Sequence, residues 1–378
     1  MKIYCILLDT APLHSGFVDF AKKNNASLSY QISNSHTASS VLSMLTGKNP
    51  SDLEGEEQSI HKSWFRNQDS VYSKSFTWNK DTITERLLSL GWEVNFHNSH
   101  TIIKDVCSHP DYTRTTAYPG GLKKEESLWW DHQGIISATL GNGQDSESFY
   151  MDEVEHIKFF QKPSEKNQFN FVLYHQHHMA EQLGNLYDVS YDRLNWLLSN
   201  WDLDEPDSLF YIFSDHGLYK KINRYQNPPY SWYTWAIVKN NINDLKPKPL
   251  VAISDFKSSI EHVLGLETSS ENSIFENLKK DRTYFIEDSR FSVDDMRTTT
   301  FASIRAYEWD GDNPTSFVQT SYHKPEEKFI NYFYNTKAVN SNVDRQYNGN
   351  VEILEKPLQE HVEMKKELEE ILNRKGII

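Results

Sequence analysis

Cysteine is scarce in this chain of 378 residues, which contains only Cys5 and Cys107. Two cysteines do not make the disulfide framework that is typical of small secreted domains. Long apolar runs are lacking too, since no stretch approaches the roughly 20 residues of a membrane-spanning helix. The apolar stretch near Met1 is shorter than a signal-peptide core, and no small-residue cleavage site follows it. We therefore expect a cytoplasmic protein that does not contact a membrane.

Positive charge is also in short supply. The chain has 39 Lys and Arg residues against 53 Asp and Glu residues, which gives a formal net charge of -14 at pH 7. A general nucleic-acid binder needs a basic face that displaces counterions from phosphate, so this function class is excluded. Hydrophobic residues make up 38% of the chain and aromatic residues 13%, which is enough for a globular core.

Apolar runs alternate with helical patterns along residues 1–266, as in a parallel sheet with crossover helices. One such unit covers residues 82–97, where a capping box starts a helix that Gly91 ends before the next strand. The apolar positions expected on one face of this helix are Ile83, Leu87 and Leu90. A second unit runs from a strand at 169–174 through a helix to the apolar run 209–213. We therefore predict an α/β fold with a doubly wound, mostly parallel sheet flanked by helices.

The pattern changes after the polar segment 267–273. Short alternating segments then predict antiparallel strands, and a charged amphipathic helix closes the chain. We expect a catalytic domain at residues 1–266 and a small C-terminal antiparallel β plus helix subdomain at 276–378. Residues 102–150 form a predicted substrate-side insert. Its Lys and Trp pairs could hold a sugar or aromatic group, or the insert could simply pack over the sheet edge.

Metal-ligand side chains follow two of the predicted strands. Asp215 and His216 come directly after the run 209–213, and Asp9 follows the first apolar strand. Ligands gather outside the carboxyl ends of strands in open α/β sheets, and carboxylates beside an imidazole suit a divalent cation such as zinc or manganese. Each residue has another interpretation, because Asp9 could cap a helix at Ala11–Pro12 and the Asp-His pair could belong to a surface turn.

A polar turn at residues 35–40 leads into a predicted helix that Gly47 ends. A hydroxyl at the start of this helix faces free backbone N–H groups and the positive end of the helix dipole. Its alkoxide and an incoming phosphoryl or sulfuryl anion would both be stabilised there. A run of Ser and Thr residues that only caps the helix has the same sequence pattern.

Three imidazoles follow the strand that ends at Tyr174. They are His175, His177 and His178. Histidines there can bind a metal, contact an anionic oxygen or protonate a leaving group, but each could also be an ordinary core or surface residue. Because all these sites follow strand-like runs, a parallel sheet would bring them to one rim.

Four blocks of the sequence together have a family pattern. In the first, Thr37 lies ten positions ahead of the glycine in Leu45–Gly47, the spacing of a nucleophile signature. The other blocks are Asp81–Trp92, Tyr187–Leu198 followed by Ser214–Gly217, and Ile253–Gly265. On these residues, the chain resembles the sulfatase-like branch of the alkaline phosphatase superfamily.

The resemblance implies one divalent metal ion, which would be Mn, Zn or Ca. Its implied ligands are Asp9, Thr37, Asp215 and His216. Thr37 is also the implied nucleophile, and His175 and His178 are implied to flank the anionic group of the substrate. Further candidate contacts to the substrate are His177, Lys220, Lys221 and Arg224, although the three cationic residues could equally form a solvated basic turn.

Two departures from the sulfatase pattern favour phosphorus over sulfur. Sulfatases convert a Cys or Ser into formylglycine with the help of a nearby Pro and Arg, but the corresponding residues here are Thr37, Ser39 and Val41. Thr10 stands where sulfatases usually carry a second Asp after Asp9, which argues against a calcium-type sulfatase site. An unmodified Thr is the nucleophile of relatives that cleave or transfer phosphate esters.

We therefore expect a metal-dependent hydrolase or transferase of phosphodiesters or phosphomonoesters that works through a covalent Thr37 intermediate. Its expected substrate is a small-molecule or glycan-linked ester. Two alternatives stay open, namely a sulfuric ester hydrolase and a binding protein of the same fold whose chemistry has decayed.

Overall fold

The computed structural model describes residues 1–34, 37–49, 82–98, 114–117, 154–174, 177, 187–217, 232–266, 272–290, 298–335 and 351–378. Their strands form an eight-stranded sheet, sheet A, and a five-stranded sheet, sheet B. By their contacts, the residues divide into two compact units. Unit 1 contains Met1–Leu28, Ile83–Ser214 and Trp235–Lys246, and unit 2 contains Ser29–Thr82, Asp215–Thr234 and Pro247–Ile378.

Sheet A has the strand order β4-β3-β5-β1-β6-β7-β2-β8. Its strands are β1 (Lys2–Leu8), β2 (Ser27–Ile32), β3 (Glu93–Asn98), β4 (Arg114–Ala117), β5 (Gln168–Tyr174), β6 (Ser208–Phe213), β7 (Tyr233–Asn240) and β8 (Leu250–Ala252). β1 pairs in parallel with β5 and β6, and β3 pairs in parallel with β4 and β5. β2 and β8 are also parallel, whereas β7 runs antiparallel to β6. The predicted mostly parallel α/β sheet is confirmed.

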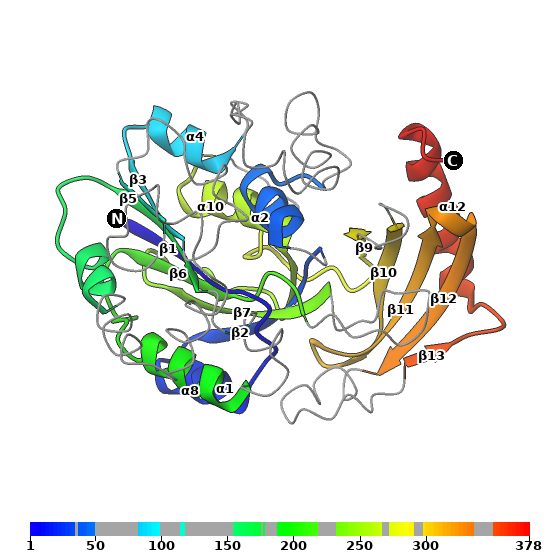
Figure 1. Ribbon diagram of the computed structural model, residues 1–378, viewed down its shortest axis with the longest axis horizontal. Helices are drawn as coiled ribbons and strands as arrows, with labels where there is room; N and C mark the ends of the chain where they lie inside the picture. The colour runs from blue at the N-terminus through cyan, green and yellow to red at the C-terminus, as the bar shows by residue number, and fades with distance from the viewer. Residues whose placement is uncertain are drawn as a thin grey trace, which may run out of the picture. The chain divides into compact units, whose positions relative to one another are not determined.

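Apolar side chains on both faces of the central strands explain why β1, β5 and β6 are buried. Helices α1 (Ser15–Lys23) and α8 (Tyr187–Leu198) lie side by side over one face, and α4 (Ile83–Ser89) covers the other (Figure 1). Phe17 of α1 and Leu194 of α8 join Ile6 and Ile212 of the sheet in one hydrophobic cluster. The fully buried Cys5 thiol lies in β1, where loss of solvation raises its pKa.

Sheet B is antiparallel throughout and has the order β13-β12-β11-β10-β9. Its strands are β9 (Thr283–Arg290), β10 (Thr298–Asp310), β11 (Asn313–His323), β12 (Lys328–Asn335) and β13 (Val351–Ile353). The closing helix α12 (Gln359–Arg374) packs against β10 and β11, where Leu368 and Leu372 meet Phe301 and Tyr322. Antiparallel strands followed by an amphipathic helix were predicted for this part of the chain, and both are present.

The rest of unit 2 holds the helices that bear on the site. Helix α2 (Thr37–Thr46) packs against a 3-10 turn, η5 (Ile253–Asp255), and against α10 (Phe256–Val263). A second 3-10 turn, η6 (Lys324–Glu326), joins β11 to β12. Gly47 takes the left-handed backbone (φ 71°) that commonly ends a helix, which agrees with the predicted end of α2.

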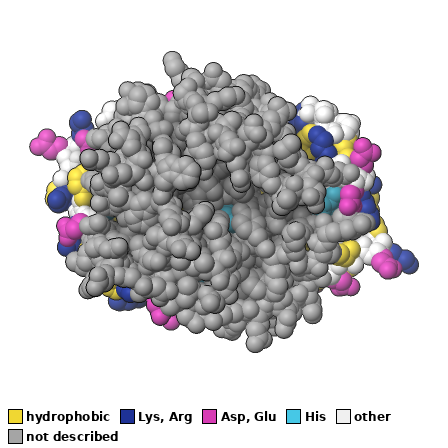
Figure 2. Space-filling view, in the orientation of Figure 1, with side chains coloured by type: hydrophobic (Ala, Val, Ile, Leu, Met, Phe, Trp, Pro, Cys, Tyr) yellow, Lys and Arg dark blue, Asp and Glu magenta, His cyan; other side chains and the backbone are white. Residues whose placement is uncertain are grey.

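Among the described residues that are visible in Figure 2, both acidic and basic side chains lie at the margins of the drawn face. No helix in the described part of the chain is both long enough and apolar enough to cross a membrane.

Candidate metal centre

Strand register places two carboxylates next to each other at the carboxyl ends of β1 and β6. Leu7 of β1 pairs with Phe213 of β6 in a parallel ladder. Asp9 and Asp215 each lie two residues further along, just beyond the last paired residues. Parallel strands that end in register bring equivalent positions to one rim, so this adjacency follows from the sheet itself.

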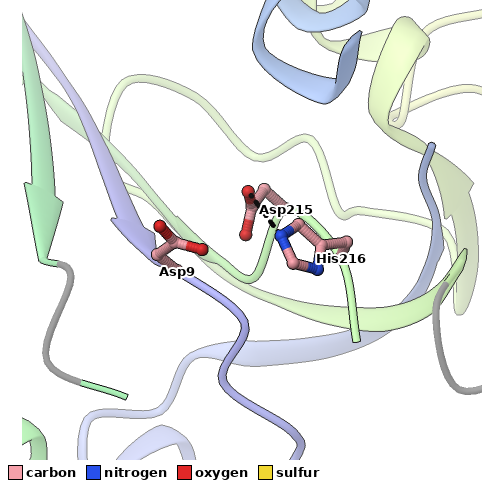
Figure 3. A group of neighbouring side chains, drawn as sticks. All are labelled: Asp9, Asp215 and His216. Atoms are coloured by element: carbon pink, nitrogen blue, oxygen red, sulfur yellow. Dashed lines mark ion pairs between the residues drawn. The ribbon is translucent and has the colours of Figure 1, made fainter. Parts of the chain in front are cut away.

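Asp9, Asp215 and His216 form a compact, fully buried group. One ligand atom of each residue lies within 4.8 Å of the others, and none of the three residues has solvent-exposed surface. Figure 3 shows the three side chains close together, with Asp9 extending from the end of β1. Two buried carboxylates at such a distance repel each other and are costly to desolvate unless a cation compensates their charge.

The donor set and its spacing fit a divalent metal ion. Two carboxylates and an imidazole are ligands of zinc and manganese, whereas calcium takes six to eight oxygen ligands. Asp215 Oδ2 lies 3.6 Å from His216 Nε2, and Thr37 Oγ1 lies 3.2 Å from the same nitrogen. Ligands at the usual zinc bond lengths around one tetrahedral ion are separated by roughly 3.3 Å, so these spacings suit such an ion.

His216 presents its Nε2 lone pair toward Thr37. Its Nδ1 lies 2.8 Å from the carbonyl oxygen of Gly217, which can only accept, so the Nδ1–H tautomer is the one that this hydrogen bond selects. Nε2 is then an acceptor, and the Thr37 hydroxyl donates to it across 3.2 Å. A metal-binding histidine is commonly oriented in this way, by a backbone carbonyl at its other ring nitrogen.

Helix α2 begins at Thr37 and is tied to the Asp215 backbone. The fully buried Ser40 hydroxyl lies 2.7 Å from the carbonyl oxygen of Asp215 and 3.0 Å from that of Asn34. The Asn34 side chain in turn donates to Ser43 Oγ at 2.8 Å. The first turn of α2 and the segment that carries Asp215 are therefore held together by buried hydrogen bonds, which fixes Thr37 beside His216.

The other predicted site residues are not brought to this group by any described contact. His177 is fully buried, its Nδ1 lies 2.8 Å from Ser190 Oγ, and its ring lies 4.6 Å from that of Tyr191. His175, His178, Lys220, Lys221 and Arg224 lie outside the described residues, as does the predicted insert 102–150 apart from β4. Their roles stay predictions.

Sequence reasoning did not assign a role to Thr10 or Ser40. Thr10 has a left-handed backbone (φ 60°) and donates a hydrogen bond to Asp9 Oδ1 at 2.8 Å. A Thr that follows a strand does not predict a left-handed backbone, because Gly and Asn adopt that conformation far more often. Ser40 could have been suspected only from its place one turn after Thr37.

Comparison of the structure with solved structures identifies the fold of the chain. No protein-family model matches the chain, and no curated protein matches its sequence. A solved structure of a protein in the alkaline phosphatase superfamily from Vibrio parahaemolyticus matches with a TM-score of 0.54 at 12% identity, covering 100% of this chain and 88% of that one. The chain has the fold of this superfamily. At this level of identity the likeness concerns the fold alone, and the activity must be argued from the site.

Two further solved structures match with lower TM-scores. The C-terminal periplasmic domain of EcEptC from Escherichia coli, in complex with Zn, matches with a TM-score of 0.45 at 12% identity, over 75% of this chain and 88% of that one. Alkaline phosphatase from the Antarctic bacterium TAB5 matches with a TM-score of 0.45 at 11% identity, over 70% of this chain and 97% of that one.

Proposed function

We propose that the chain is a metal-dependent hydrolase or transferase of phosphate esters that works through a covalent intermediate on Thr37. One observation carries the proposal: the Thr37 hydroxyl, at the first residue of α2, lies 3.2 Å from His216 within the buried group that also contains Asp9 and Asp215. A nucleophile, a cation site and a helix N-terminus then meet at one place, as attack on an anionic ester requires.

The proposed ligands are the two carboxylates, His216 and the Thr37 oxygen. A divalent cation bound there supplies Lewis-acid chemistry that lowers the pKa of the Thr37 hydroxyl and offsets its repulsion from the anionic ester. The Ser40 hydroxyl holds the backbone carbonyl of Asp215, and the Gly217 carbonyl orients the His216 imidazole through its Nδ1. The N–H groups of the first turn of α2 favour negative charge on the ester.

The proposed reaction has two steps. The Thr37 alkoxide, whose proton has passed to solvent, forms a bond to phosphorus while the bond from phosphorus to the leaving oxygen breaks. The leaving oxygen takes a proton, and we propose that His175 or His178, which are predicted to flank the anionic group, donates it. Water or an acceptor alcohol then attacks phosphorus and releases Thr37. The substrate we propose is a small-molecule or glycan-linked phosphate ester, and membership of the sulfatase-like branch stays part of this proposal.

The test compares aryl phosphodiester, phosphomonoester and sulfate substrates with metal-stripped protein that is resupplied with zinc, manganese or calcium. We expect phosphoester cleavage with zinc or manganese and a loss of more than about a thousandfold in kcat for Thr37→Val. Thr46→Val is the matched control, because Thr46 is a buried hydroxyl residue at the other end of the same helix. Acid-quenched protein should carry a substrate-derived group on the peptide that contains Thr37.

Other outcomes would point elsewhere. A preference for the sulfate ester would overturn the choice of phosphorus. Protein that takes up no metal and cleaves no ester would make the chain a binding protein of this fold, and equal losses in Thr37→Val and Thr46→Val would remove the nucleophile assignment.

A further inference from the structure

The turn after β1 contains an unusual residue. The Ala11 N–H donates to the Leu8 carbonyl at 3.2 Å, which closes a tight turn with Asp9 and Thr10 at its centre. Thr10 has φ 60°, and a positive φ at the third residue of such a turn is usually supplied by Gly or Asn. For a β-branched residue this conformation is an outlier, since its side chain crowds the backbone.

Hydrogen bonds hold the backbone on both sides of Thr10. On one side, the Asp9 N–H donates to the Tyr174 carbonyl at 2.9 Å. On the other side, the Trp235 indole N–H donates to the Ala11 carbonyl at 2.8 Å. A strained backbone conformation is kept where contacts of the neighbouring residues hold it in place. Such residues occur most often at functional sites. A Gly would fit this backbone without strain, so the Thr side chain needs an explanation of its own.

The Thr10 side chain makes a hydrogen bond that Gly cannot make. Its hydroxyl donates to Asp9 Oδ1 at 2.8 Å, and both residues are fully buried. A hydrogen bond to an ionised carboxylate is strong and directional, so it restricts rotation of the carboxylate about its last side-chain bond. Asp9 does not cap the following helix, because the residue that caps α1 is His14. The hydroxyl of Thr10 therefore acts on a carboxylate of the candidate metal centre.

We propose that Thr10 is a positioning residue that holds the Asp9 carboxylate in its ligating orientation. This inference rests on the proposed metal centre and adds a residue that works through Asp9 without itself binding the ion. Residues that hydrogen-bond to a metal ligand orient it and so raise metal affinity. The strained backbone at position 10 is then tolerated because the same residue supplies the orienting hydroxyl.

The experiment measures zinc affinity of the metal-stripped full chain by isothermal titration calorimetry. Thr10→Val removes the hydroxyl and keeps the β-branched shape, whereas Thr10→Gly removes the hydroxyl and also relieves the backbone. We expect both to weaken zinc binding about tenfold or more, and Thr10→Ser, which keeps the hydroxyl, to stay within about twofold of the unmodified chain. Val disfavours a positive φ at position 10 and Gly tolerates it, so the test still gives an answer if one of these two variants fails to fold.

Thr46→Val is the control for a merely structural effect. The Thr46 hydroxyl is buried and donates to the Leu42 carbonyl at 2.7 Å, so its removal also deletes a buried hydrogen bond. We expect this variant to lose stability in urea unfolding while its zinc affinity is unchanged. The inference would be overturned if the position 10 variants and Thr46→Val all lost stability while the position 10 variants kept their zinc affinity.

The outcomes separate this inference from the proposed function. If the unmodified chain binds zinc and the Val and Gly variants bind it equally well, Thr10 does not position Asp9, although the metal centre stands. Weaker zinc binding in Thr10→Ser and Thr10→Gly, but not in Thr10→Val, would assign the effect to the methyl group that Val keeps and would also reject the hydroxyl. If the unmodified chain takes up no zinc, the metal centre fails and the inference fails with it.

Discussion

Replacing Arg282 with Met should destabilise unit 2 because it leaves a buried carboxylate without its cation. Arg282 makes two parallel hydrogen bonds to Asp255, each 2.7 Å long, and the exposed fractions of the two side chains are 19% and 1%. Asp255 also accepts the Ala252 N–H at 3.0 Å, which helps start the helical segment that continues into α10. The guanidinium further stacks over the Tyr284 ring at 4.5 Å.

The expected loss follows from burial. Removing one partner of a buried ion pair costs about 3–5 kcal/mol, mostly because the remaining charge is uncompensated. The Ala252 N–H still donates a hydrogen bond to the Asp255 carboxylate in the variant. We therefore expect a loss of free energy of unfolding in the lower part of this range, about 3 kcal/mol. A double variant, Asp255→Leu with Arg282→Met, should recover part of the loss because the uncompensated carboxylate is then removed.

Urea unfolding followed by tryptophan fluorescence gives the free energy of unfolding of each variant. The control is Lys158→Met, because Lys158 pairs with Glu155 at the same 2.7 Å distance while the exposed fractions of those side chains are 59% and 65%. We expect no measurable change for that variant. The argument from burial would be refuted if Arg282→Met and Lys158→Met lowered the free energy of unfolding by similar amounts. A change below about 1 kcal/mol for Arg282→Met would also refute it.

Two further predictions concern pH and metal. Burial lowers the pKa of His323 to about 4, below the value of about 6.5 in unfolded chains. This histidine therefore contributes stability above pH 6.5 that is lost as the pH falls toward 4, about 3 kcal/mol in all, and His323→Gln should flatten that part of the pH profile of urea unfolding. An unchanged slope would contradict the assignment. Zinc at about 100 times its dissociation constant should raise the free energy of unfolding by about 2.7 kcal/mol, and chelation should reverse the gain. In the Asp215→Asn variant, zinc should no longer stabilise the protein against thermal unfolding. A stabilisation by zinc that persists in this variant would place the ion elsewhere.

The parts of the fold that the sequence predicted are those with local signals. Runs such as Ile3–Leu8 and Leu209–Phe213 are apolar on both faces, which identifies buried strands before any partner is known. The positions of Asp9 and Asp215 follow from those runs, because residues that end parallel strands share a rim. The structure brings both to one group with His216.

Other features depend on contacts between distant parts of the chain. Leu90 was expected on the apolar face of its helix, but α4 ends at Ser89, Gly91 turns the chain with φ 81°, and Leu90 is 51% exposed. The conformation of Thr10 is set by Tyr174 and Trp235, which no local pattern around residue 10 reveals. The expected domains at 1–266 and 276–378 and the expected cytoplasmic location stay predictions.

The place of β1 in sheet A also has a consequence for biosynthesis. Both of its neighbours come much later in the chain, β5 at Gln168–Tyr174 and β6 at Ser208–Phe213. At a synthesis rate of 5–20 residues per second, about 10 to 40 s pass between translation of β1 and translation of β6. During that time an apolar strand meant for the middle of a sheet lacks at least one of its two partners, so the nascent chain is exposed to aggregation until β6 has been made.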